Sequence, residues 1–114
     1  MISDNACVDH ELAVPEVLPL EPLDPDQVIE GDPAAGSVPL TTLADLEIGV
    51  WEMTPGVCSD VEADELFVVL SGSATVQFED GSAVELHPGS VVRLHQGEHT
   101  TWTVRETLRK IYLG

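Results

Sequence analysis

Three of the four histidines of this chain lie close together, in the segment 87-HPGSVVRLHQGEHTTW-102. Imidazole is the commonest side-chain ligand for metals, so such a cluster raises the question of a metal site. His95 and His99 are four residues apart, a spacing that brings two side chains together on a helix. Gly97 interrupts the segment between them, and the residues around it have the texture of strands and turns. We therefore expect solvent-accessible histidines at strand ends and turns.

The length of 114 residues is that of one domain with a single core. No run of eighteen apolar residues occurs, which argues against a membrane span. Residues 1–20 carry acids and no Lys or Arg, unlike a secretory signal, so we expect a cytoplasmic protein. Cys7 and Cys58 are then expected to be free thiols, and no Cys/His array suggests a zinc knuckle.

The formal net charge of −17 is the most extreme property of the composition. All four basic side chains lie near the C-terminus: Arg93, Arg105, Arg109 and Lys110. A surface this acidic repels phosphate backbones and anionic headgroups, so we expect no nucleic-acid and no membrane partner. The acidity indicates solubility or adaptation to high salt. A surface for a basic partner is the alternative, but no motif arranges the acids for that purpose.

Residues 1–37 differ in texture from the rest of the chain. The segment 15-PEVLPLEPLDPDQVIEGDP-33 contains five prolines, which exclude a regular helix or a central strand. We predict an extended acidic arm whose first ten to fourteen residues are disordered. Apolar side chains along the arm suggest that it lies on its own core or on a second subunit: Leu18, Leu20, Leu23, Val28 and Ile29.

Residues 38–114 read as one β-domain. Short β-type runs alternate with turn signals, and the runs are 47–53, 65–70, 73–79, 82–86, 90–94, 100–105 and 108–113. Asp80-Gly81 between two alternating runs is a strong signal for a tight hairpin. Ser71-Gly72 is interpreted as another turn between strands. Seven or eight short strands without a helical period predict an all-β sandwich or barrel.

The spacing of several motif residues resembles the cupin superfamily. Glu65 is followed by Gly72 after six residues, then by the Asp80-Gly81 hairpin, Pro88-Gly89 and Gly97, which resembles the two signature motifs of that superfamily. The chain is similar to small single-domain cupins of the ureidoglycine aminohydrolase-like and ethanolamine-utilisation types, through 51-WEMTPG-56, 64-DELFVVLSG-72, 88-PGSVVRL-94, 102-WTV-104 and 109-RKIY-112. The resemblance spans about residues 47–113 and implies a small jelly-roll barrel, a fold that hosts many chemistries.

The resemblance also gives a test for metal. Metal-binding cupins place an HxH pair shortly before the motif glutamate and a third histidine three residues after the second-motif glycine. Here the positions before Glu65 read 58-CSDV-61, and Thr100 stands where the third histidine would be. His99 is one position away, which on a strand is the opposite face. We therefore expect no metal and no cofactor. A non-standard site of Glu65 with Cys58, Asp60 or His99 stays open if a bulge shifts the register.

Strand parity predicts which side chains meet inside the barrel. Glu65 shares a face with Phe67, Trp102 lies on the face of Thr100, and Lys110 lies on that of Tyr112. A buried glutamate needs a cation, for which Lys110 is the first choice and Arg93 the second. The predicted ligand-binding residues are Glu65, Trp102, Lys110, Tyr112, Trp51 and Phe67. The alternative is that the ion pair and the tryptophans only hold the barrel together.

Three functions stay open from the sequence. The first is a cupin that binds a small polar metabolite in its barrel without metal. The second is an enzyme like ureidoglycine aminohydrolase, acting on a small nitrogen-rich metabolite. The third is a non-catalytic partner or regulatory subunit. We also expect a homodimer, because Leu66, Val68 and Leu70 make the outer face of their strand apolar as well, and such a strand must be covered on both sides.

Overall fold

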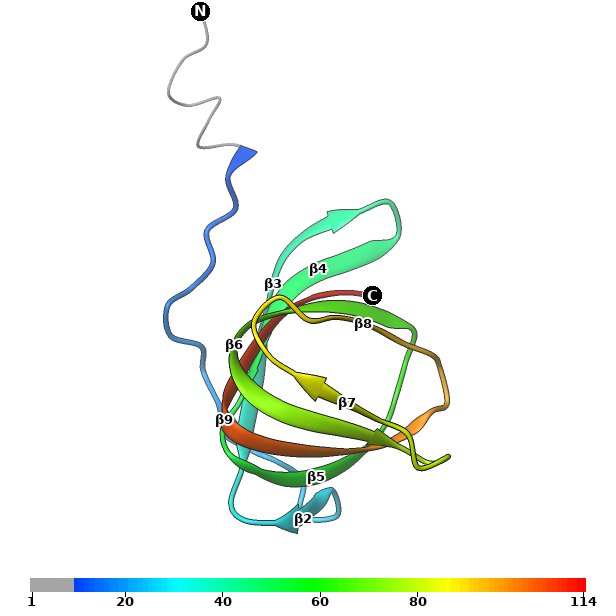
Figure 1. The fold of residues 1–114 in the computed structure, drawn as a ribbon. Coiled ribbons are helices and arrows are strands. Elements are labelled where there is room, and N and C mark those ends of the chain that lie inside the picture. The colour runs from blue at the N-terminus through cyan, green and yellow to red at the C-terminus, as the bar shows by residue number, and fades with distance from the viewer. Residues whose placement is uncertain (1–9) are drawn as a thin grey trace, which may run out of the picture.

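The computed structural model describes residues 10–114, which form one curled, nine-stranded sheet (Figure 1). Its strands are β1 (Glu21–Pro22), β2 (Val28–Glu30), β3 (Ala34–Leu43), β4 (Leu46–Met53), β5 (Gly56–Val61), β6 (Glu65–Phe78), β7 (Ala83–Leu86), β8 (Val91–Leu94) and β9 (His99–Leu113). The predicted all-β jelly-roll barrel is confirmed. The expectation for Cys7, and that of disorder as far as residue 9, lie outside the described residues. Within residues 10–114 no helix is long and apolar enough to cross a membrane.

Two long strands organise the barrel. β6 and β9 pair antiparallel along almost their whole length. The other edge of β6 pairs with β8 and then β7, and the other edge of β9 pairs with β4 and β5 (Figure 1). Because β9 touches strands on both sides of the fold, its inward-facing side chains lie where the walls of the barrel meet.

The sequence interpretation divided each of these long strands in two, and this was wrong. The chain passes through Ser71-Gly72 inside β6 without leaving the sheet, and the register with β9 shifts there instead. Gly72 has a φ of +94°, and a Cβ at this position would lie 2.1 Å from the backbone oxygen of Thr107. The glycine thus serves a bulge that bends the strand, where the turn signal suggested an end. The Asp80-Gly81 hairpin forms as predicted between β6 and β7.

Four strands were not anticipated: the short β1 and β2, and the longer β3 and β5. β3 begins at Ala34, inside the segment assigned to the arm, and pairs with β4. Its sequence contains Gly36 and Pro39, which argue against a strand, but the register shifts beside Pro39 and so accommodates the missing donor. β5 adds to β9 and carries β2 on its other edge.

The N-terminal segment lies against its own barrel over part of its length. β1 and β2 pair with β3 and β5, and farther out Arg109 donates hydrogen bonds to the backbone oxygens of Pro15 (2.7 Å) and Glu16 (2.5 Å). Leu18 is buried, and the carbonyl of Pro19 lies against Gly36, where a Cβ would collide with it. Residues 10–14 run outward from the barrel (Figure 1).

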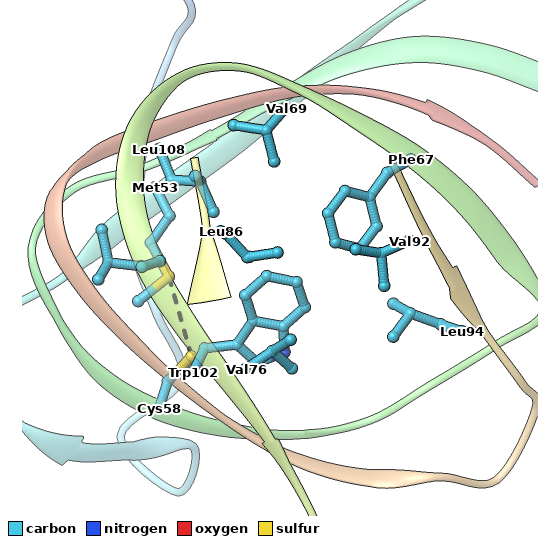
Figure 2. Close-up of a cluster of buried hydrophobic side chains, with 12 residues drawn as sticks. Met53, Cys58, Phe67, Val69, Val76, Leu86, Val92, Leu94, Trp102 and Leu108 are labelled. Atoms are coloured by element: carbon cyan, nitrogen blue, oxygen red, sulfur yellow. Dashed lines mark hydrogen bonds between the residues drawn. The ribbon is translucent and has the colours of Figure 1, made fainter. Parts of the chain in front are cut away.

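The barrel interior is a continuous apolar core (Figure 2). Met53, Phe67, Leu94 and Leu108 are fully buried at its centre. The outer face of β6 and β8 differs, because it stays apolar and partly open to solvent. Leu66, Leu70 and Val91 are there 37%, 43% and 63% exposed. The core therefore explains only one face of these strands.

Candidate functional site

One end of the barrel interior is hollow instead of packed. The cavity has a volume of about 430 Å³, within the range of small-molecule sites. Its walls come from β3, β4, β5, β9 and the start of β6, while the segment between β1 and β2 contributes Leu23 and Gln27. The backbone oxygen of Gln27 accepts a hydrogen bond from Ser59 N–H (2.8 Å), which fixes this segment over β5.

Lys110 on β9 projects into the base of the cavity. Its side chain is only 7% exposed, and its Nζ lies 4.6, 4.3 and 4.9 Å from the ring centroids of Trp51, Phe67 and Trp102. Aromatic faces attract a cation through their quadrupole, and more strongly when water is excluded. Three rings therefore replace part of the hydration that a buried ammonium loses.

Glu65 completes the environment of this ammonium. Lys110 Nζ donates to Glu65 Oε2 at 2.8 Å, so the first-choice pairing from the sequence is confirmed. The second choice, Arg93, instead pairs with Asp64 at 3.2 Å on the surface. Because the Glu65 side chain is 25% exposed, its carboxylate faces the cavity as well as the lysine.

The aromatic side chains form the apolar wall. The rings of Trp51 and Trp102 have centroids 6.0 Å apart and are tilted by 53°. Tyr112 packs over Gly49, where any Cβ would collide with the phenol, and its hydroxyl donates to Glu47 Oε2 at 2.7 Å. Burial and this carboxylate raise the pKa of Tyr112 to about 12. The phenol therefore stays protonated at neutral pH.

Five of the six predicted binding residues line the cavity: Glu65, Trp102, Lys110, Tyr112 and Trp51. Phe67 does not. It lies behind Lys110, packed 5.7 Å from Trp102, and belongs to the core. Strand parity placed its side chain on the correct face but gave no information on its depth.

Two carboxylates at the cavity were not among the predicted binding residues. Asp60 lines it from β5, opposite Thr100 on β9. Glu62 follows in the connection to β6 and accepts a hydrogen bond from Thr100 Oγ1 (3.0 Å), which in turn accepts one from Trp102 Nε1 (3.0 Å). Burial and the neighbouring Asp60 raise the pKa of Glu62. The folded protein therefore holds a proton on this carboxyl more readily than a free glutamate would.

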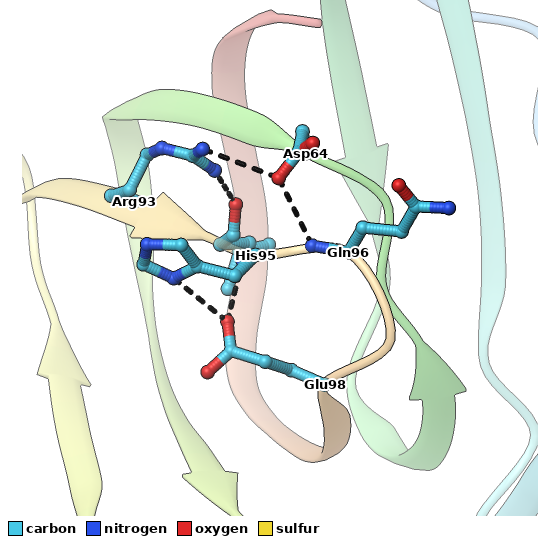
Figure 3. Close-up of polar contacts among 6 residues, drawn as sticks. Asp64, Arg93, His95, Gln96 and Glu98 are labelled. Carbon is cyan, nitrogen blue, oxygen red and sulfur yellow. Dashed lines mark hydrogen bonds and ion pairs between the residues drawn. The ribbon is translucent and has the colours of Figure 1, made fainter.

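The connection that carries Glu62 is fixed by the turn before β9. Glu62 N–H donates to Glu98 O and Gly97 N–H donates to Glu62 O, both at 2.8 Å. Next to it, Asp64 Oδ1 accepts from Gln96 N–H at 3.1 Å and from Arg93 (Figure 3). The backbone and surface hydrogen bonds position Glu62 without using its side chain.

The histidines lie away from the cavity. His99 is exposed on the face of β9 opposite Thr100, while His95 accompanies Glu98 in the surface turn (Figure 3). Cys58 is a buried free thiol whose Sγ lies 3.9 Å from Met53 Sδ (Figure 2), and burial raises its pKa to about 11.

The residues that line the cavity do not fit the metal site of the metal-binding cupins. Thr100 stands at the third ligand position and is engaged by Glu62, and Cys58 is held as a neutral thiol. In residues 10–114 no group of three or more His, Cys, Asp or Glu side chains is arranged to hold a metal ion.

The curled sheet with its cavity between β4, β5 and β9 is the architecture of a cupin barrel. A profile of the EutQ-like cupin domain matches residues 40–112, and the chain belongs to this family. No curated protein matches the chain.

Solved structures agree with this assignment. A protein of unknown function from Pseudomonas syringae pv. tomato is 31% identical, with a TM-score of 0.73 over 85% of this chain and 43% of its own. A putative ethanolamine utilization protein Q from Salmonella typhimurium is 21% identical, with a TM-score of 0.60 over 70% of this chain and 68% of its own. The EutQ protein of Clostridium difficile is 22% identical, with a TM-score of 0.61 over 71% of this chain and 61% of its own. The last two likenesses concern the fold.

Proposed function

We propose that this chain binds a small polar metabolite in the barrel cavity and uses no standard cupin metal site. The observation that carries the proposal is the composition of the cavity wall. Two indoles stand beside an ammonium, a phenol and three carboxylates, contributed by strands far apart in the sequence. A cavity needed only for packing would be filled with apolar side chains, as the rest of this core is.

The polar groups of this wall are held in place before any ligand arrives. Lys110 is fixed by Glu65 and three rings, and Trp102 is fixed through Thr100. Preorganised groups lose little conformational freedom on binding, so even a small ligand gains affinity from them. If the ion pair only stabilised the barrel, neither the open volume beside it nor the indole surface of Trp51 that lines the cavity would be needed.

A second candidate is hydrolysis of a small nitrogen-rich metabolite, as in the ureidoglycine aminohydrolase-like cupins. One observation favours it: Glu62 has a raised pKa and borders the cavity, which suits a group that exchanges protons. We rank it second, because the residues that would hold a metal for such a reaction are replaced here.

A thermal-shift screen of small polar metabolites tests the proposal. A ligand that binds the folded state raises the melting temperature by mass action, and the stabilisation grows with the logarithm of the ligand concentration above Kd. We expect at least one class of small metabolite to stabilise the wild type and to stabilise Trp51→Ala much less. A screen without any stabilising compound would favour the third function, a non-catalytic partner subunit.

A further inference from the structure

The cavity contains more negative than positive charge. Three carboxylates line it, from Asp60, Glu62 and Glu65, against the single ammonium of Lys110. Glu65 and Lys110 neutralise each other at 2.8 Å. The other two carboxylates lie at the end of β5 and in the connection that follows it.

No basic side chain within residues 10–114 forms an ion pair with Asp60 or Glu62. The chain has four Lys and Arg residues in all. Each is engaged with a different carboxylate: Arg93 with Asp64, Arg105 with Glu85, Arg109 with Glu52 and Lys110 with Glu65. The four histidines do not line the cavity either.

The two carboxylates therefore repel each other, and the charge of Lys110 offsets this only in part, because its ion pair is with Glu65. Asp60 raises the pKa of Glu62, after burial as the larger cause. Thr100 donates one hydrogen bond to Glu62, and Val61 N–H donates one to Asp60 (2.8 Å). An ionised carboxylate accepts several hydrogen bonds, so both retain capacity on the side of the cavity. A positively charged hydrogen-bond donor bound there would offset the repulsion between the carboxylates and also donate to their free acceptor positions.

The wall next to these carboxylates suits the same kind of ligand. Trp51 and Trp102 offer indole surface, which attracts cations and packs against alkyl chains. Lys110 already occupies one position against these rings, as an ammonium that is built into the protein. The aromatic surface therefore tolerates a cationic group in this environment.

We infer that the cavity is specific for a small organic cation, an alkylammonium or alkylguanidinium ion, whose charged end lies between Asp60 and Glu62 and whose carbon chain lies against Trp51 and Trp102. This inference rests on the proposed function and names its ligand class. An anion is disfavoured, because three carboxylates line the cavity against one ammonium, which is already paired with Glu65. A neutral compound would gain the apolar contacts but leave the repulsion in place.

The test uses three probes with a butyl chain, n-butylamine, n-butylguanidine and n-butanol, and butyrate as an anion of the same number of carbon atoms as the amine, at constant ionic strength and neutral pH. Both tryptophans of the chain line the cavity, so intrinsic fluorescence reports on its occupancy. We expect saturable fluorescence changes with n-butylamine and n-butylguanidine, at least tenfold lower affinity for n-butanol, and no saturation with butyrate.

Three variants separate the local charges from the overall charge. Asp60→Asn and Glu62→Gln should each weaken n-butylamine binding at least tenfold, because each removes one charged acceptor of the ammonium. Asp45→Asn makes the same change of net charge in the exposed turn between β3 and β4 and should leave the affinity unchanged. An equal loss in all three variants would reduce the effect to long-range attraction and overturn the inference.

The probes also keep this inference apart from the proposed function. If butyrate or n-butanol binds as tightly as n-butylamine, or if n-butylamine shows no saturation, the assignment to cations is wrong. The cavity would remain a binding site as long as the metabolite screen finds a stabilising compound of another class. Only failure of that screen as well would remove the binding function itself.

Discussion

The pair of Glu65 and Lys110 makes a quantitative prediction, because its two members differ in how far they are buried. Replacing Lys110 by Met keeps the length of the side chain and removes the ammonium from the three rings. Glu65 then faces the cavity without a cation. Breaking a fully buried pair costs about 3–5 kcal/mol, and we expect about 3 kcal/mol here because the Glu65 side chain is 25% exposed.

The converse change should cost less. Glu65→Gln keeps an oxygen that accepts a hydrogen bond from Lys110, and the ammonium keeps its aromatic contacts, each type of contact contributing about 1 kcal/mol or more. We expect a loss of roughly 1–2 kcal/mol. The double variant leaves no unpaired charge, so its loss should fall short of the sum of the single losses by about 1–2 kcal/mol.

Urea unfolding of the four proteins, followed by circular dichroism at neutral pH, measures this coupling. Ser73→Ala with Glu106→Gln, which removes an exposed hydrogen bond of 3.1 Å between β6 and β9, is the matched control and should show a coupling near zero. If the losses of stability in Glu65→Gln and Lys110→Met add up in the double variant, the reasoning is refuted, because additive losses mean that the two side chains do not interact.

Three further outcomes are expected. The raised pKa of Glu62 means that the folded state binds its proton more tightly than the unfolded chain. Wild-type stability should therefore rise relative to Glu62→Gln as the pH falls from neutral through that raised pKa, and a parallel pH dependence of the two proteins would contradict this. Light scattering should show a homodimer that buries more than about 1,000 Å² in total, and a wild-type monomer at micromolar concentration would leave Leu66 and Leu70 without a partner. Protein purified without chelator or nickel resin should contain well under one equivalent of Mn, Fe, Ni or Zn, and stoichiometric metal lost in Glu65→Ala would show the register argument to be wrong.

Strand periodicity made part of this site predictable. A side chain on a strand faces the same way as its neighbours two positions along, so the sequence alone placed Glu65 beside Phe67 and Lys110 beside Tyr112. Because a buried carboxylate needs a cation, Lys110 was the predicted partner of Glu65. The structure places the two at the distance of an ion pair. The Asp80-Gly81 hairpin was equally predictable, because its turn chemistry is local.

The rest of the site depends on features that periodicity does not report. Glu62 lies in a connection between strands, where no alternation applies, and it reaches the cavity because the turn at Gly97 holds its backbone. Its signal in the sequence is only an acidic residue among others in 60-DVEADE-65. Gly72 was misinterpreted for a related reason, since a glycine with positive φ serves a bulge as well as a turn.

A crystal structure of the protein with n-butylamine tests the central claim most directly. The account predicts one amine in the cavity, with its nitrogen within hydrogen-bond distance of the Asp60 and Glu62 carboxylates and its chain against Trp51. Glu65 and Lys110 should keep their contact of 2.8 Å. An empty cavity at saturating amine, or an amine nitrogen directed away from both carboxylates, would contradict it.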